Sequence, residues 1–85
     1  MKSFNFVVND ELGIHARPAG LIVKEAKKFQ SIIKITKGDR TVLASQLMMI
    51  MSLGVKKGEE VSVTIEGEDE NEAYTVIESF FHNNL

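Results

Sequence analysis

A single histidine stands where a glycine-containing loop leads into a predicted helix, in residues 13–19 (Gly-Ile-His-Ala-Arg-Pro-Ala). Proline has a fixed φ and no N–H, so Pro18 suits the first turn of a helix. The unpaired backbone N–H groups there, at Ala16 and Arg17, and the positive end of the helix dipole favour an anion beside His15. The Arg17 guanidinium can add two parallel donors to a phosphate. The segment therefore predicts a histidine nucleophile inside an anion site, suited to carrying a phosphoryl group.

Length and composition limit the class of protein. The chain has 85 residues, 44% hydrophobic and 26% charged, so we expect one globular domain spanning residues 1–85. It contains no cysteine, which excludes disulfides and thiolate chemistry. No long apolar run follows Met1, so we expect no signal peptide and no membrane insertion, and we predict a cytoplasmic location. A net charge of −2 argues against nucleic acid as a partner.

Charged residues are unevenly distributed along the sequence. Lysines follow the histidine motif at Lys24, Lys27 and Lys28, whereas the second half is crowded with acidic side chains. One interpretation is that both groups are simply solvated faces. The other is that a weakly positive face around His15 attracts an acidic protein partner.

Strands with one apolar and one polar face are predicted in four places. Apolar residues alternate with polar ones in the segments Phe4–Val8, Ile33–Thr36, Thr41–Ala44 and Val61–Glu66. Between the second and the third of these, Gly38-Asp39 predicts a two-residue turn of type II′, because glycine stands first.

Two long amphipathic helices are predicted from apolar residues spaced three and four apart. The first runs from Ala16 to Phe29, and its apolar stripe comprises Ala19, Ile22, Val23, Ala26 and Phe29. The last element of the chain is the second, with a stripe of Ala73, Val76, Ile77, Phe80 and Phe81. This order of elements predicts an α+β fold in which helices cover one face of a sheet and water contacts the other.

The segment from Gln46 to Leu53 is apolar almost all round and ends at Gly54, which suits a helix C-terminus. Ser45 could serve as its N-cap. One face, at Ile50 and Leu53, must belong to the core. The other apolar side chains are Leu47, Met48 and Met51, and two interpretations stay open: they fill gaps in a small core, or they form an exposed patch that accepts differently shaped partners.

Taken together, these motifs resemble HPr, the histidine-containing phosphocarrier family of the bacterial phosphoenolpyruvate–sugar phosphotransferase system. Residues 13–19 match its active-site motif, and residues 51–55 (Met-Ser-Leu-Gly-Val) with Lys57-Gly58 match its second signature. Residues 66–70 are similar to the turn before its last helix. The resemblance covers the whole chain. It implies an open-faced β-sandwich, a four-stranded antiparallel sheet covered on one face by three helices in the order β-α-β-β-α-β-α.

The resemblance also implies a reaction. Enzyme I, charged by phosphoenolpyruvate, passes a phosphoryl group to Nδ1 of His15, Arg17 stabilises that group, and the IIA domains of sugar permeases receive it. The chain would then be a carrier rather than an enzyme, a monomer that needs neither cofactor nor metal. The partner surface is expected to comprise Gly20, Leu21, Lys24, Leu47, Met48 and Met51.

Two positions depart from the family pattern. Many relatives carry, just before the second helix, a regulatory serine that an ATP-dependent kinase phosphorylates, and Gln46 stands at that position here. Ser45 is adjacent, but a shift of one residue turns its hydroxyl elsewhere, so we do not expect this regulation. Met49 stands at a position where family members more commonly have a small or polar residue. Its side chain either enlarges the partner surface or packs inward.

A second function of a different class stays open. The chain could be a regulatory docking module with the HPr fold, which binds a transcription regulator or a metabolic enzyme. Such a module would need neither His15 nor Arg17, so their presence favours the carrier. The other histidine, His82, is expected to be solvated near the end of the last helix.

Overall fold

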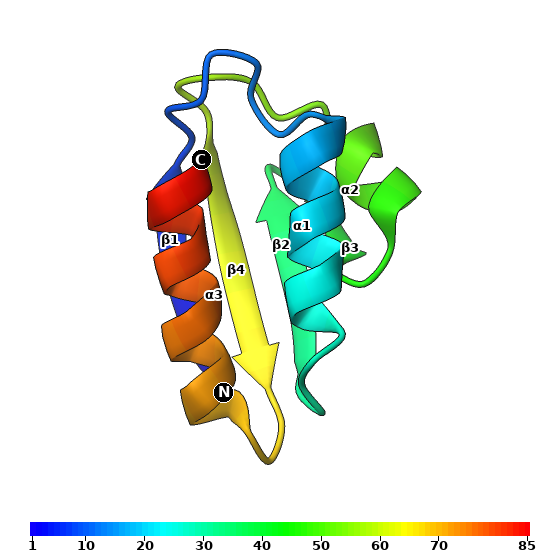
Figure 1. The fold of residues 1–85 in the computed structure, drawn as a ribbon. Helices are drawn as coiled ribbons and strands as arrows, with labels where there is room; N and C mark the ends of the chain where they lie inside the picture. The colour runs from blue at the N-terminus through cyan, green and yellow to red at the C-terminus, as the bar shows by residue number, and fades with distance from the viewer.

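The computed structural model describes residues 1–85 and contains every predicted element in the predicted order (Figure 1). The elements are β1 (Lys2–Val7), α1 (Ala16–Ala26), β2 (Ile32–Lys37), β3 (Arg40–Leu43), α2 (Leu47–Ser52), β4 (Glu60–Glu66) and α3 (Glu70–Asn84). None of the helices is long and apolar enough to cross a membrane.

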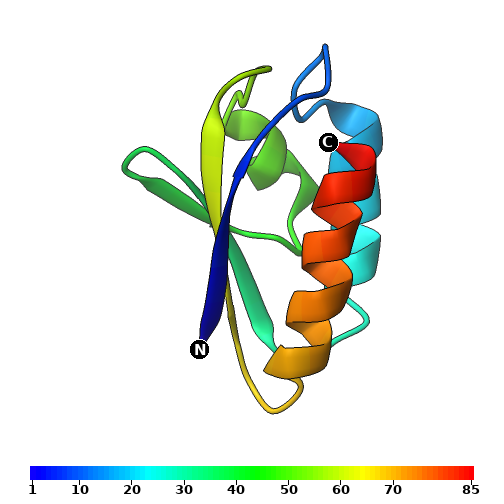
Figure 2. The ribbon, with the colours of Figure 1, turned by 90° about the vertical axis from the view of Figure 1, so that its left-hand side faces the viewer.

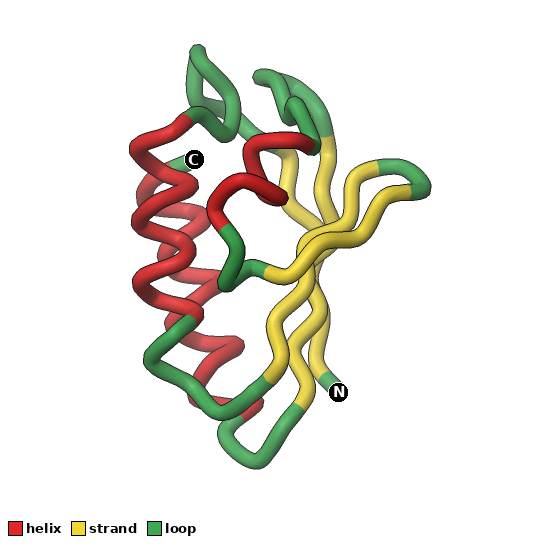
Figure 3. The backbone as a smooth tube through the Cα atoms, turned by 90° about the vertical axis from the view of Figure 1, so that its right-hand side faces the viewer, coloured by secondary structure: helices red, strands yellow, loops and turns green.

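The strands form one antiparallel sheet in the order β1-β4-β2-β3, so the first and last strands of the chain pair directly. The views from the two sides show the sheet as one layer and the helices as the other (Figure 2, Figure 3). Because successive strand residues point to opposite faces, Phe4, Val63 and Ile35 lie in register on the covered face and are buried. The predicted fold class is confirmed.

Each helix contributes fully buried side chains to a single core. Ile22 comes from α1, Ile50 from α2, and Ile77 and Phe81 from α3. The predicted stripe of α3 is confirmed, and so is that of α1 up to Ala26, since their members are buried or partly buried. Burial of these stripes holds α1 and α3 on the sheet, because helices of this length are only marginally stable alone.

The turn between β2 and β3 is of the predicted kind. Lys37 pairs with Arg40, so the loop has two residues. Gly38 has φ +61°, whereas Asp39 is not in the positive-φ region. A type II′ turn has a positive φ only at the first of its two central residues, whereas a type I′ turn has a positive φ at both. The turn is therefore of type II′.

Helix α1 is shorter than the sequence predicts. It ends at Ala26 rather than Phe29, because the N–H groups of Lys28 and Phe29 donate to carbonyls three residues back and so tighten the last turn. The chain then turns towards β2, and the partly buried Phe29 packs against the core from the turn.

The predicted cap of α2 is wrong. Gln46, not Ser45, is the N-cap residue, and no side chain caps the helix. The turn before it is closed by a hydrogen bond from the Gln46 N–H to the Leu43 carbonyl, 3.2 Å long, which places Ser45 one residue before the cap. The predicted end of α2 at Gly54 is confirmed, since Gly54 has φ +61° and its N–H donates to the Met51 carbonyl.

One carboxylate joins two turns that lie far apart in the sequence. Asp69, at the start of α3, accepts hydrogen bonds from the Gln30 N–H at 2.8 Å and the Ser31 N–H at 2.9 Å, and a further one from the Ser31 hydroxyl. The Ser31 hydroxyl, followed by the Gln30 N–H, holds the pKa of Asp69 below its ordinary value. Asp69 thereby ties the end of the α1–β2 turn to the start of α3.

We expect Asp69→Asn to lower the free energy of unfolding at neutral pH, because an amide replaces a charged acceptor. A lowered folded pKa contributes stability that is complete above the ordinary value of 3.8 and is lost as the pH falls through the folded pKa. The difference from the wild type should therefore shrink below about pH 4. Urea unfolding at several pH values measures it, with the exposed neighbour Glu68→Gln as control. Equal stability at neutral pH would contradict this role.

Candidate functional site

His15 is the N-cap residue of α1, as predicted. Its backbone is extended (φ −93°, ψ −174°), and its carbonyl accepts the first helical hydrogen bond from the Ala19 N–H at 3.0 Å. The imidazole does not cap the helix, so the ring is free to face outwards, and it is half-buried. The first turn holds no acidic side chain that would neutralise the positive end of the helix.

Several hydrogen-bond donors around the His15 ring have no acceptor within the protein. No turn, loop, cap or side-chain hydrogen bond uses the backbone N–H groups of Ala16 and Arg17. The exposed Arg17 guanidinium makes neither a hydrogen bond nor an ion pair. These groups are therefore available to an anion at the helix start.

The loop that carries His15, residues 8–15, is held against the β4 side of the molecule by one glycine. Gly13 has φ +67° and is buried. A Cβ atom on it would overlap the Val55 carbonyl oxygen, which accepts the Ile14 N–H at 3.0 Å. Only glycine allows this approach, so Gly13 sets where the next two residues lie.

The end of the chain holds the same loop from the other side. The Leu85 carbonyl accepts both the Asn9 N–H at 2.5 Å and the Asp10 N–H at 2.7 Å. Helix α3 runs so that its C-terminal end lies beside this loop (Figure 1). These contacts are not predictable from the sequence, because backbone hydrogen bonds across more than seventy residues carry no side-chain signal.

A shallow depression of about 270 Å³ surrounds the imidazole. Its walls are mostly polar and come from the His15 loop, α1 and the end of α3: Asp10, His15, Arg17, Pro18, Leu21 and Asn84. His15 and Arg17 were predicted as site residues, and the structure brings them together. Asp10 and Asn84 were not predicted.

Asp10 lies on one side of the imidazole. Its Oδ1 atom is 3.6 Å from Nε2 of His15, within the range of an ion contact but too long for a hydrogen bond. The other ring nitrogen, Nδ1, takes part in no hydrogen bond or ion pair. The ring therefore has one nitrogen beside a carboxylate and one nitrogen without a protein partner.

Next to the depression, α1 and α2 carry an apolar patch, which we define as Leu21, Leu47, Met48 and Met51. All four side chains are exposed, Met48 most of all at 74%. Ile50 of α2 and Leu53, the residue just after this helix, are buried. One face of α2 therefore packs into the core, and the other is exposed to solvent. The side chains of the patch are therefore exposed and do not fill gaps in the core, and their use by partners stays a prediction.

Other residues expected at the partner surface lie on α1 beside the patch. Gly20 is half-buried with open space beyond its Cα, and Lys24 is exposed. Met49 is 41% exposed, so it does not pack inward. It lies on the opposite flank of α2 from Leu47, because positions two apart on a helix do not share a face.

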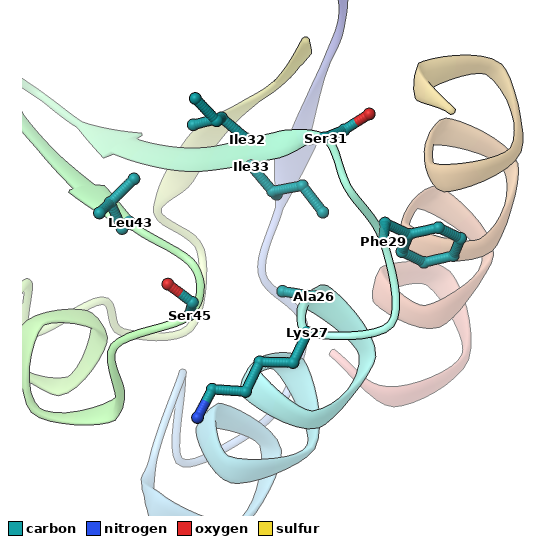
Figure 4. Close-up of a pocket in the computed structure, with 8 residues that line it drawn as sticks. All are labelled: Ala26, Lys27, Phe29, Ser31, Ile32, Ile33, Leu43 and Ser45. Atoms are coloured by element: carbon teal, nitrogen blue, oxygen red, sulfur yellow. The ribbon is translucent and has the colours of Figure 1, made fainter. Parts of the chain in front are cut away.

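A second hollow, of about 350 Å³, lies at the other end of α1. Ala26 and Phe29 lie on one side of it, and Leu43 and Ser45 on the other (Figure 4). Ser45 is exposed and its hydroxyl makes no hydrogen bond. An α-helix of eleven residues is about 16 Å long, so this hollow is separate from the surroundings of His15.

His82 is exposed on α3, as expected, and the edge of its ring packs against Phe6 with the centroids 5.1 Å apart. No group of three or more His, Cys, Asp or Glu side chains lies close enough together to hold a metal ion.

A family model described as the PTS HPr component phosphorylation site matches residues 2–83. The chain belongs to the HPr family. It is 34% identical over 77 residues to the phosphocarrier protein HPr of Mycoplasma capricolum, an alignment that covers 91% of this chain and 86% of that protein. The resemblance found in the sequence is thus confirmed, and with it membership of a phosphocarrier family of the phosphotransferase system.

Solved HPr structures have the same architecture. HPr-C-His from Thermoanaerobacter tengcongensis superposes with a TM-score of 0.92 at 40% identity, over 98% of this chain and 93% of that one. Crh of Bacillus subtilis, a catabolite repression protein that is a domain-swapped dimer in its crystal, gives 0.78 at 37% identity, over 92% and 90% of the two chains.

Two glycine variants test how the His15 loop is held. We expect Gly13→Ala to lower the free energy of unfolding by about 1–3 kcal/mol, because alanine is strained at this φ and meets the Val55 carbonyl. Gly20→Ala should instead raise it by about 0.5–1 kcal/mol, since Gly20 lies inside a helix with open space around it. Urea denaturation measures both. Similar effects of the two substitutions would contradict the close contact at Gly13.

Proposed function

We propose that this protein is a phosphoryl carrier that accepts a phosphoryl group on His15 from enzyme I, charged by phosphoenolpyruvate, and passes it to the IIA domains of sugar permeases. One observation above all supports this proposal. The imidazole stands at a helix N-terminus beside a guanidinium that has no protein partner. A purely structural histidine would be expected to use its ring nitrogens within the fold.

The transfer needs little acid–base machinery. The lone pair on Nδ1 forms a bond to phosphorus while the bond from phosphorus to the donor breaks, and that electron pair returns to the donor. Positioning and charge stabilisation supply most of the catalysis in phosphoryl transfer. The N–H groups of Ala16 and Arg17, with the Arg17 guanidinium, are placed to stabilise the charge on the transferred oxygens.

The shape of the site fits a carrier better than an enzyme that acts on small molecules. The depression around His15 is shallow and open, so it does not exclude water from a bound substrate. We infer that the partner protein closes the site during transfer. The donors come from a helix start and one arginine only, which limits how tightly a phosphoryl group is held and lets it leave again.

The apolar patch is the proposed docking surface for these partners. It adjoins His15, because Leu21 belongs both to the patch and to the wall of the depression. Unbranched methionine side chains suit a surface that must receive partners of different shape. We propose that the protein does this as a monomer in the cytoplasm. The Crh dimer makes the monomer a prediction to be measured by light scattering.

A regulatory docking module is the second candidate, and the similarity to Crh favours it. The reactive arrangement of His15 and Arg17 favours the carrier instead, since docking alone would not require it. Gln46 at the cap of α2 provides no hydroxyl for a kinase, and we do not expect Ser45 to replace it.

Incubation with enzyme I and phosphoenolpyruvate tests the carrier. We expect wild-type protein to gain an acid-labile, base-stable phosphate, which His15→Ala loses completely and His82→Ala keeps, because only His15 stands among free donors. Arg17→Ala should slow the transfer by about tenfold or more, as expected for loss of a charged donor to the transition state. Mass spectrometry and quenched time courses measure both effects. Absence of label on the wild type would refute the carrier.

Paired surface variants test the docking patch. We expect Met48→Asp to raise the KM for HPr in the enzyme I reaction several-fold, because a carboxylate replaces apolar contact area. Ile32→Asp is the matched control, since Ile32 is also an exposed apolar side chain, at 57%, but belongs to β2 and to the hollow at the other end of α1 from His15. Equal effects of the two variants would show that the partner does not use α2.

A further inference from the structure

Asp10 is the one carboxylate that faces the His15 ring. Its Oδ1 atom lies 3.6 Å from Nε2, with both side chains about one-third exposed. No lysine or arginine forms an ion pair with Asp10, so its charge is not already neutralised. The neighbouring Glu11 differs, since it is 82% exposed and pairs with Lys57.

The backbone of Asp10 is held by two hydrogen bonds, and its carboxylate is held by a third. The Asp10 N–H donates to the Leu85 carbonyl at 2.7 Å, and the Asp10 carbonyl accepts the Gly13 N–H at 2.9 Å. Its Oδ1 also accepts the Leu12 N–H at 2.9 Å. These contacts hold the Asp10 carboxylate beside Nε2 without using the ring itself.

A neutral imidazole carries its proton on one nitrogen and a lone pair on the other. A fixed negative charge beside Nε2 favours the proton on that nitrogen, and the lone pair is then on Nδ1. The other charged group in the depression is Arg17, on α1, while α3 contributes only the neutral Asn84. Arg17 disfavours a positive charge on the ring, and among the side chains that line the depression Asp10 is the one that can offset it.

We propose that Asp10 is a positioning residue for phosphoryl transfer, which keeps the proton on Nε2 and so directs Nδ1 towards phosphorus. This inference rests on the proposed carrier function. When Nδ1 bonds to phosphorus, the ring retains its Nε2 proton and becomes positively charged, while the donor recovers the electron pair of the broken bond. The Asp10 carboxylate stabilises that positive charge through space, and no proton needs to move.

Asp10→Asn separates this role from a structural one. Asparagine keeps an Oδ1 atom that can accept the Leu12 N–H, but it removes the charge. Glu11→Gln removes an equal charge one residue away and is the matched control. Asp10→Glu restores the charge on a longer side chain, and backbone amide spectra establish that each variant is folded.

Two readouts are needed. Nitrogen NMR of isotope-labelled histidine rings, about two pH units above the ordinary histidine pKa, gives the ratio of the two neutral forms of His15. We expect Asp10→Asn to reduce the preference for Nε2–H by about two- to fivefold, the range for a partly exposed ion contact. The rate of phosphoryl uptake from phosphorylated enzyme I should fall by a similar factor, and Asp10→Glu should recover part of both effects.

The outcomes distinguish the two proposals. An unchanged ratio of ring forms in folded Asp10→Asn, or the same change in Glu11→Gln, would overturn the role of Asp10 while leaving the carrier intact. A wild-type protein that takes up no phosphoryl group would refute the carrier, whatever the ring spectra show. If Asp10→Asn does not fold, Asp10→Ser removes the charge and keeps an oxygen that can accept the Leu12 N–H, and an unchanged ratio of ring forms in that folded variant would overturn the role.

Discussion

The loop that carries His15 is held between two backbone carbonyl groups from distant parts of the chain. The Val55 carbonyl fixes Ile14, next to the histidine, and the Leu85 carbonyl fixes Asp10 at the start of the same turn. Both carbonyls belong to segments anchored in the core, because Val55 and Leu85 are buried. The position of the imidazole thus depends on packing of the whole domain rather than on side-chain contacts of the ring itself.

This arrangement separates the groups that hold the fold from those available for chemistry. Every buried side-chain nitrogen and oxygen has a hydrogen-bond partner. By contrast, the guanidinium of Arg17 has none, and the methionines of α2 are exposed. Unsatisfied polar and apolar groups therefore gather around one end of α1. A partner protein can satisfy both kinds at once, which is what a carrier that serves several proteins requires.

Much of the fold and the reactive centre is predictable because its signals are local. Alternating residues indicate the strands, Gly38 indicates the turn, and Pro18 places His15 at a helix start. The end of α1 at Ala26 was not predictable, since the apolar spacing continues to Phe29 and the local hydrogen bonds that tighten the last turn leave no pattern in the sequence. The proximity of Asp10 to the ring was not predictable either, because it follows from the backbone path of the loop and not from a spacing in the motif.

NMR of phosphorylated protein with isotope-labelled histidine rings tests most directly whether His15 presents Nδ1 to phosphorus. After incubation with enzyme I and phosphoenolpyruvate, we predict a phosphorus–nitrogen coupling to Nδ1 of His15 and to no other ring nitrogen. A phosphoryl group on Nε2, on His82 or on a hydroxyl group would contradict the assignment of the reactive atom.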